Sequence, residues 1–114
     1  MKAKISYGDK IISNNILIAD TLLTRLIGLM FKKQLVGSDG LLLDPCNSIH
    51  TFFMRYSLDI VFLSSENKIV KIVRGIKPWR MTWIYFRAKK TLELPAGKLP
   101  YDLKEGDLLE VVNV

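Results

Sequence analysis

The sequence predicts a small α+β domain in which one helix packs on a mostly antiparallel sheet, curled or closed into a barrel. Six to eight short segments are rich in alternating apolar, β-branched or aromatic residues, and turn-forming residues separate them. Only residues 21–31 repeat their apolar side chains with helical spacing. A chain of 114 residues, 49% of them hydrophobic, is expected to form a single domain, residues 1–114, with its own core.

The N-terminal part is expected to contain short strands followed by the helix. Apolar residues occupy every second position of residues 3–7, which is the strand period, and a further strand is expected at 16–18. Asp20 or Thr21 can cap the helix, because a short side-chain oxygen accepts a free first-turn N–H. The apolar residues of 21–31 then cover an arc of about 160°, which predicts a broad core-facing surface.

The rest of the chain is expected to form strands around one irregular segment. The expected strands share apolar, β-branched or aromatic residues bounded by turn residues: 41–43, 49–54, 58–63, 68–74, 91–94 and 108–112. Gly75 and Pro78 end the strand at 68–74, so residues 75–90 are expected to be irregular or a flexible loop.

The positive charge of the chain comes from one segment. The chain has 17 Lys and Arg against 11 Asp and Glu, a formal net charge of +6. No acid lies between Glu66 and Glu93, but eight cations do: Lys68, Lys71, Arg74, Lys77, Arg80, Arg87, Lys89 and Lys90. The rest of the chain therefore carries a net charge of −2, so any acidic partner would be met by this segment.

Aromatic residues are interleaved with these cations, and this predicts a binding surface. Cations neutralise phosphates and aromatic faces stack on unpaired bases, while the same composition suits an anionic membrane surface or an acidic protein. We therefore expect a non-catalytic binding or accessory module whose loop 74–90 contacts an anionic partner. The expected binding residues are Arg74, Lys77, Trp79, Arg80 and Trp83, with His50 and Arg55 adjoining.

A purely structural role is the alternative for the same segment. Lysines protect the exposed edge strands of many sheets from aggregation, and large aromatic residues usually pack inside a protein. In that case the cations belong to a solvated edge strand, and Trp79 and Trp83 are core or loop anchors.

A small enzyme or ligand-binding pocket around His50 is the alternative from another class. His50 would line a polar cleft with Asp59 or Glu93, each of which interrupts an apolar strand. Cys46, four residues before His50, is the candidate nucleophile. Phosphate-binding glycine loops, zinc-protease motifs and serine-hydrolase motifs are absent from the sequence, so catalysis is the less favoured function.

Two further interpretations concern the same residues. If 49–54 is a strand, four residues span roughly 13 Å, so Cys46, His50 and Met54 cannot share an ion, and neither metal nor cofactor is expected. Arg25 interrupts the apolar residues of the predicted helix. Because charges in apolar surroundings are seldom buried without a partner, Asp59 and Glu93 could form a structural ion pair with Arg25.

Three blocks of the sequence resemble a known family. They are R-x-x-G-L-M at 25–30, F-M-x-x-x-L-D-I-x-F-L at 53–63 and L-E-L-P-A-G at 92–97, and the C-x-x-x-H-T and P-W-R motifs at 46–51 and 78–80 resemble one subgroup. The family is a widespread prokaryotic group of small single-domain proteins of unknown function. The resemblance covers roughly residues 17–110 and implies a compact, β-rich fold, but it brings no activity, substrate or catalytic residue.

The sequence also bears on location. It contains no apolar run near the roughly 20 residues needed to span a bilayer. No continuous apolar stretch follows the first four residues, so no signal peptide is expected and a cytoplasmic protein is predicted, although some relatives are exported. A single cysteine excludes an intramolecular disulfide.

Overall fold

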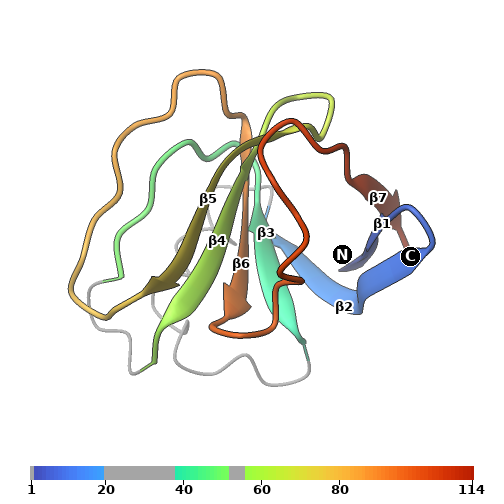
Figure 1. Ribbon diagram of the computed structural model, residues 1–114, viewed down its shortest axis with the longest axis horizontal. Helices are drawn as coiled ribbons and strands as arrows, with labels where there is room; N and C mark the ends of the chain where they lie inside the picture. Colours follow the sequence, from blue (N-terminus) through green and yellow to red (C-terminus); the bar gives the residue numbers. More distant parts are fainter. Residues whose placement is uncertain (1, 20–37, 52–55) are drawn as a thin grey trace.

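A computed structural model describes residues 2–19, 38–51 and 56–114 of the chain. Seven strands form one sheet in the order β5-β4-β6-β3-β2-β1-β7 (Figure 1). They are β1 (Lys2–Tyr7), β2 (Lys10–Ala19), β3 (Gly40–Leu43), β4 (Leu58–Leu63), β5 (Ile69–Ile76), β6 (Lys90–Pro95) and β7 (Glu110–Asn113). Strands β2 and β3 are parallel, and the other neighbouring pairs are antiparallel.

The expected α+β class is wrong. The described residues form one mixed seven-stranded sheet and include no helix, and its two edge strands, β5 and β7, are not paired with each other in the strand order. The helix predicted at 21–31 lies outside the described residues. Among the described residues, irregular chain covers part of the sheet: Ile49 and Ala88 pack against the face of β4 that carries Phe62. A layer made of irregular chain has no periodic pattern, so the sequence does not reveal it.

The sheet is strongly curled. Ile69, at the start of the edge strand β5, donates its N–H to the carbonyl of Asp107 at 2.8 Å. Leu109, just before the other edge strand β7, donates to the carbonyl of Asn67 at 2.9 Å. The two ends of the sheet order are therefore linked by hydrogen bonds between residues 67–69, where β5 begins, and residues 106–109, just before β7.

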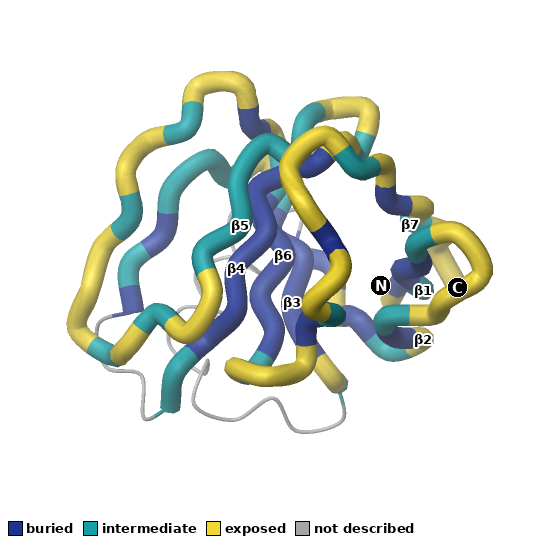
Figure 2. Tube along the Cα trace, viewed as in Figure 1, coloured by how far each residue is buried: buried dark blue, intermediate teal, exposed yellow. Residues whose placement is uncertain are grey.

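Strand β4 is buried on both faces, which explains its uninterrupted apolar sequence (Figure 2). Val61 and Leu63 belong to the larger core, which β1, β2, β3 and β6 complete from one side. Leu58, Ile60 and Phe62 belong to a second core on the other side. The second core is the one on which the candidate site is built.

Backbone amides satisfy the buried carboxylate of Asp59 in β4. Its Oδ1 accepts the N–H of Gly75 at 2.9 Å, and its Oδ2 accepts those of Gly97 at 2.9 Å and Leu99 at 3.4 Å. Gly97 has φ +90°, a conformation that side-chain-bearing residues rarely adopt. Asp59 therefore ties the end of β5 and the turn after β6 to the central strand.

Replacing Asp59 tests this structural role. In Asp59→Asn the amide group presents donors to backbone donors, so we expect a loss of about 2–3 kcal/mol in the free energy of unfolding, measured by urea denaturation. The matched control is Asp102→Asn, which removes an exposed carboxylate paired with Lys10 at 2.8 Å and should leave the urea midpoint unchanged. Equal midpoints for the two variants would contradict the role given to Asp59.

Candidate functional site

Residues 77–89, which we call the aromatic loop, run antiparallel to residues 46–51, and the two segments are joined by backbone hydrogen bonds. The bonds join Trp79 N to Thr51 O at 3.0 Å, Thr51 N to Arg80 O at 2.8 Å, Thr82 N to Ile49 O at 2.9 Å, Tyr85 N to Asn47 O at 2.9 Å and Cys46 N to Lys89 O at 2.8 Å. Both segments lie on the side of the molecule away from the two termini (Figure 1). The loop is irregular, as expected, but its backbone is held along most of its length.

The hydroxyl of Thr51 joins the two segments at their buried end. Thr51 is fully buried, and its Oγ1 donates to the carbonyl of Lys77 at 2.6 Å and accepts the N–H of Arg80 at 2.9 Å. Between those two residues Trp79 has φ +63°, which is strained for a residue with a side chain. The contacts of Thr51 therefore hold the chain in a tight bend that turns the Trp79 indole outward.

The far end of the aromatic loop is anchored by packing. The ring of Tyr85 lies against Phe62 of β4, with 4.6 Å between the ring centroids, and Ala88 is buried in the same core. Aromatic pairs at this distance add about 0.5–1.5 kcal/mol beyond the area they bury. Tyr85 is thus the aromatic residue that attaches the loop to the sheet.

The remaining large apolar residues of the aromatic loop are exposed (Figure 2). The exposed fractions are 56% for Trp79, 71% for Met81, 81% for Trp83, 54% for Ile84 and 85% for Phe86. Trp79 and Trp83 are therefore not core anchors, and the loop-anchor form of that alternative remains. The sequence analysis does not predict Met81 and Ile84 as site residues. The sequence signal for them is their position among the aromatic residues of the same segment.

Cations border these apolar side chains. Lys77, Arg80 and Arg87 are exposed, and no carboxylate in the described part of the chain forms an ion pair with them. Lys89, in contrast, is paired with Asp44 at 2.9 Å. Four of the residues predicted to bind a partner, Lys77, Trp79, Arg80 and Trp83, are therefore exposed on the same loop.

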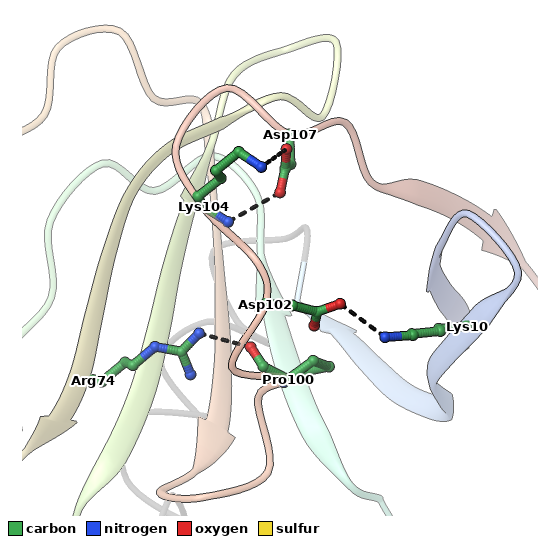
Figure 3. A network of polar contacts seen from close by, with 6 residues as sticks. All are labelled: Lys10, Arg74, Pro100, Asp102, Lys104 and Asp107. Carbon is green, nitrogen blue, oxygen red and sulfur yellow. Dashed lines mark hydrogen bonds and ion pairs between the residues drawn. The ribbon is translucent and has the colours of Figure 1, made fainter.

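Arg74 contacts the segment after β6 rather than the aromatic loop, with its guanidinium directed to Pro100 (Figure 3). Its guanidinium donates to the carbonyls of Leu99 at 3.1 Å and Pro100 at 2.6 Å, and lies 5.3 Å from the centroid of the Tyr101 ring. Arg74 thus holds the segment after β6 against β5. Arg55, the other arginine predicted to adjoin the site, is outside the described residues.

The structure places His50 and Cys46 in the segment that supports the loop. His50 is half-buried and forms an isolated antiparallel bridge with Met81. The half-buried thiol of Cys46 donates to the carbonyl of Ser48 at 3.1 Å and borders a cavity of about 510 Å³ beside Phe86 and Arg87. Among residues 2–19, 38–51 and 56–114, no group of three or more His, Cys, Asp or Glu could hold a metal ion. Met54 lies outside that part of the chain.

Asp59 and Glu93 point to opposite faces of the sheet. Asp59 is paired with Leu94 and Glu93 with Ile60, and partners in a strand ladder share a face. Leu94 belongs to the larger core and Ile60 to the second core, so the two carboxylates cannot line one cleft. The proposed ion pair of either acid with Arg25 involves a residue outside the described part.

A second cavity, of about 470 Å³, lies at the end of the sheet where β6 leaves it. It is lined by Ile12, Ser13, Ser38, Asp39, Tyr56, Leu94, Pro95 and Lys98. Two of its polar side chains bond to each other, because the Ser13 hydroxyl donates to the Asp39 carboxylate at 2.7 Å. Neither His50 nor Asp59 is among these lining residues.

The fold and the loop define a class of protein: a small, strand-built domain that displays a basic and aromatic surface at one edge. The chain belongs to the DUF192 family, described as uncharacterized ACR, whose model matches residues 3–111. This confirms the resemblance at the level of the family. No helix in the described residues is long and apolar enough to cross a membrane.

Known relatives and structures agree with this assignment. A UPF0127 protein of Pyrococcus horikoshii is 40% identical over 85 residues, 70% of this chain and 71% of the relative. A UPF0127 protein of Pyrococcus furiosus is 34% identical over 96 residues, 81% of this chain and 82% of the relative.

Two solved structures share the fold. A protein of unknown function from Novosphingobium aromaticivorans matches with TM-score 0.71 and 18% identity over 96% of this chain and 84% of that one. A putative transcription regulator from Sinorhizobium meliloti matches with TM-score 0.70 and 23% identity over 96% and 92%. At these identities the likeness concerns the fold alone.

The Thr51 contacts can be tested with the tryptophan signal, because Trp79 and Trp83 are the two tryptophans of the chain. Thr51→Val keeps the shape but leaves the Lys77 carbonyl and the Arg80 N–H without the hydroxyl of a buried side chain, which costs about 1–3 kcal/mol. We expect a lower urea midpoint, followed by tryptophan fluorescence, and faster amide hydrogen exchange at 79–82. Thr51→Ser keeps the hydroxyl and should retain slow exchange; fast exchange in Ser as well as Val would contradict the assignment.

The environment of Tyr56 predicts a pH dependence. Burial of this phenol and the nearby charge of Glu93 raise its pKa above the ordinary value of about 10. The folded state then disfavours the ionised phenol, so stability should fall as pH rises above the pKa of the unfolded chain. In an absorbance titration at 295 nm, Tyr56→Phe should remove a step above about pH 10; loss of a step below that pH would contradict the shift.

Proposed function

We propose that this protein is a non-catalytic binding module that contacts an anionic partner through the aromatic loop. The observation that carries the proposal is the set of five exposed apolar side chains within residues 79–86, on a loop whose backbone is already ordered. Contiguous exposed apolar surface rimmed by polar residues is typical of interaction sites. The cations on the same loop select for negative charge in the partner.

The charge distribution supports an anionic partner. Residues 67–92 contain no carboxylate, and Lys77, Arg80 and Arg87 form no ion pair in the part of the chain that the structure describes. Attraction between such a segment and a negative surface is screened by salt, with a Debye length of about 10 Å at 0.1 M. Binding should therefore weaken as ionic strength rises.

The pocket alternative has less support. The carboxylate of Asp59 accepts three backbone N–H groups, so Glu93, which lies on the face of the second core, remains as the acid for a pocket with His50. Neither of the two cavities described above is lined by His50 or Glu93. The Sinorhizobium meliloti neighbour is described as a transcription regulator, but the likeness to it concerns the fold and does not choose between anionic partners.

Salt-dependent binding to two polyanionic probes tests the proposal. We expect the protein to bind an oligothymidylate of about 20 nucleotides, or vesicles containing about 30% phosphatidylglycerol, and to lose at least about tenfold in affinity between roughly 50 and 300 mM salt. Replacing Lys77, Arg80 and Arg87 together by Ser should lower affinity at the lower salt by about tenfold or more.

The matched control changes the same charge elsewhere. Lys2, Lys98 and Lys104 are exposed and lie on other elements, so their joint replacement by Ser should reduce affinity far less. Equal losses in the two triple variants would show that net charge alone drives binding. Either that result or no binding to both probes would contradict the proposed function.

A further inference from the structure

Resting on the proposed function, we infer that the anionic partner is a lipid bilayer surface, into which Trp79, Trp83 and Phe86 insert with their aliphatic neighbours. The aromatic loop combines the two attractions of peripheral membrane proteins: apolar side chains that leave water for the headgroup and acyl boundary, and cations that meet anionic headgroups.

The kinds of exposed apolar residue favour a bilayer over a nucleic acid. Base stacking requires flat rings, whereas Met81 and Ile84, exposed by 71% and 54%, offer none. Both gain by entering acyl chains, as does Phe86. Tryptophan is enriched at the membrane–water interface, where an apolar ring with one N–H donor is well matched.

The hydrogen bonds of the loop backbone also suit entry into an apolar medium. Unsatisfied N–H and C=O groups oppose insertion into lipid. In the aromatic loop the N–H groups of Trp79, Arg80, Thr82, Tyr85, Ala88 and Lys89 already donate to protein acceptors. These six amides therefore lose no bonds to water as the loop approaches the acyl region; of the residues whose rings insert, Trp79 is among the six.

The order of the loop removes a further cost. Thr51 and the Tyr85–Phe62 packing hold the loop at both ends, so the free protein already presents Trp79 and Trp83 outward. A surface that is ordered before binding loses less conformational entropy on binding. The loop also lies at the outer side of the molecule, away from the termini (Figure 1). A flat membrane surface that approaches from this side meets the loop before the sheet.

Charge argues against a second copy of the chain as the occupant. Two aromatic loops placed face to face would bring together Lys77, Arg80 and Arg87 of both copies, and no carboxylate lies between Glu66 and Glu93 to offset them. A bilayer containing phosphatidylglycerol or phosphatidylserine supplies negative charge at a flat surface instead.

Tryptophan fluorescence tests the inference directly, because both tryptophans of the chain lie in the aromatic loop. With vesicles of phosphatidylcholine and about 30% phosphatidylglycerol we expect a blue shift of about 10 nm or more and quenching by lipids brominated near the headgroup end of their chains. Vesicles of phosphatidylcholine alone should bind at least about tenfold more weakly.

A pair of double variants separates insertion from charge attraction. Trp83→Ser with Phe86→Ser keeps every cation and should lower partitioning to the anionic vesicles by about tenfold or more, measured by sedimentation. The matched control, Leu108→Ser with Val112→Ser, removes apolar side chains that are 59% and 44% exposed on other elements and should leave partitioning unchanged. Circular dichroism establishes that all variants are folded.

Each other outcome decides between the two proposals. Salt-sensitive vesicle binding without brominated-lipid quenching, or binding of oligothymidylate but not vesicles, overturns the inference and leaves the proposed function standing. Concentration-dependent dimerisation that the Trp83→Ser, Phe86→Ser variant abolishes also overturns it. Absence of binding to both probes overturns the inference and the proposed function together.

Discussion

The conformation of the aromatic loop, residues 77–89, depends on the hydroxyl of Thr51. A single buried side chain bonds to the backbone on both sides of Trp79 and holds that residue in a left-handed bend. The neighbouring main-chain bonds between 46–51 and 79–89 extend the same constraint along the loop. A loop so rich in apolar residues would otherwise collapse onto the sheet, since burying each large side chain is worth roughly 1.5–3 kcal/mol. The fold therefore forgoes hydrophobic stabilisation to keep these side chains at the surface.

The curled sheet gives the loop a rigid base. The central strand β4 is buried on both faces, and its Phe62 receives Tyr85 from the loop. Asp59 in the same strand points to the opposite face, where it accepts the N–H groups of Gly75 in β5 and of Gly97 and Leu99 after β6. One face of β4 thus supports the aromatic loop through Phe62, and the other face stabilises the sheet through Asp59.

Strong local patterns allowed the sheet to be predicted in part. The apolar runs at 58–63 and 91–94 predicted strands that the structure contains as β4 and β6. The described part of the layer that covers the sheet is irregular chain, which carries no period that a sequence pattern could reveal. The partners of Asp59 were sought among cations, whereas the described structure supplies backbone amides, which residue types do not reveal. Composition identified the aromatic loop, but its order arises from bonds of Thr51 to residues 26 and 29 positions away. Local sequence gives no sign of contacts at that separation.

We propose that the aromatic loop is ordered in the free protein and is the surface that meets an anionic bilayer. The most direct measurement is a backbone amide NMR titration with bicelles containing anionic lipid, with bicelles of neutral lipid as the reference. Before lipid is added, we expect dispersed, native-like amide signals for residues 77–89. After lipid is added, we expect chemical-shift perturbations only at residues 77–89 and at the supporting residues 46–51. Perturbations centred on other strands, or loop signals typical of an unstructured chain in the free protein, would contradict this proposal.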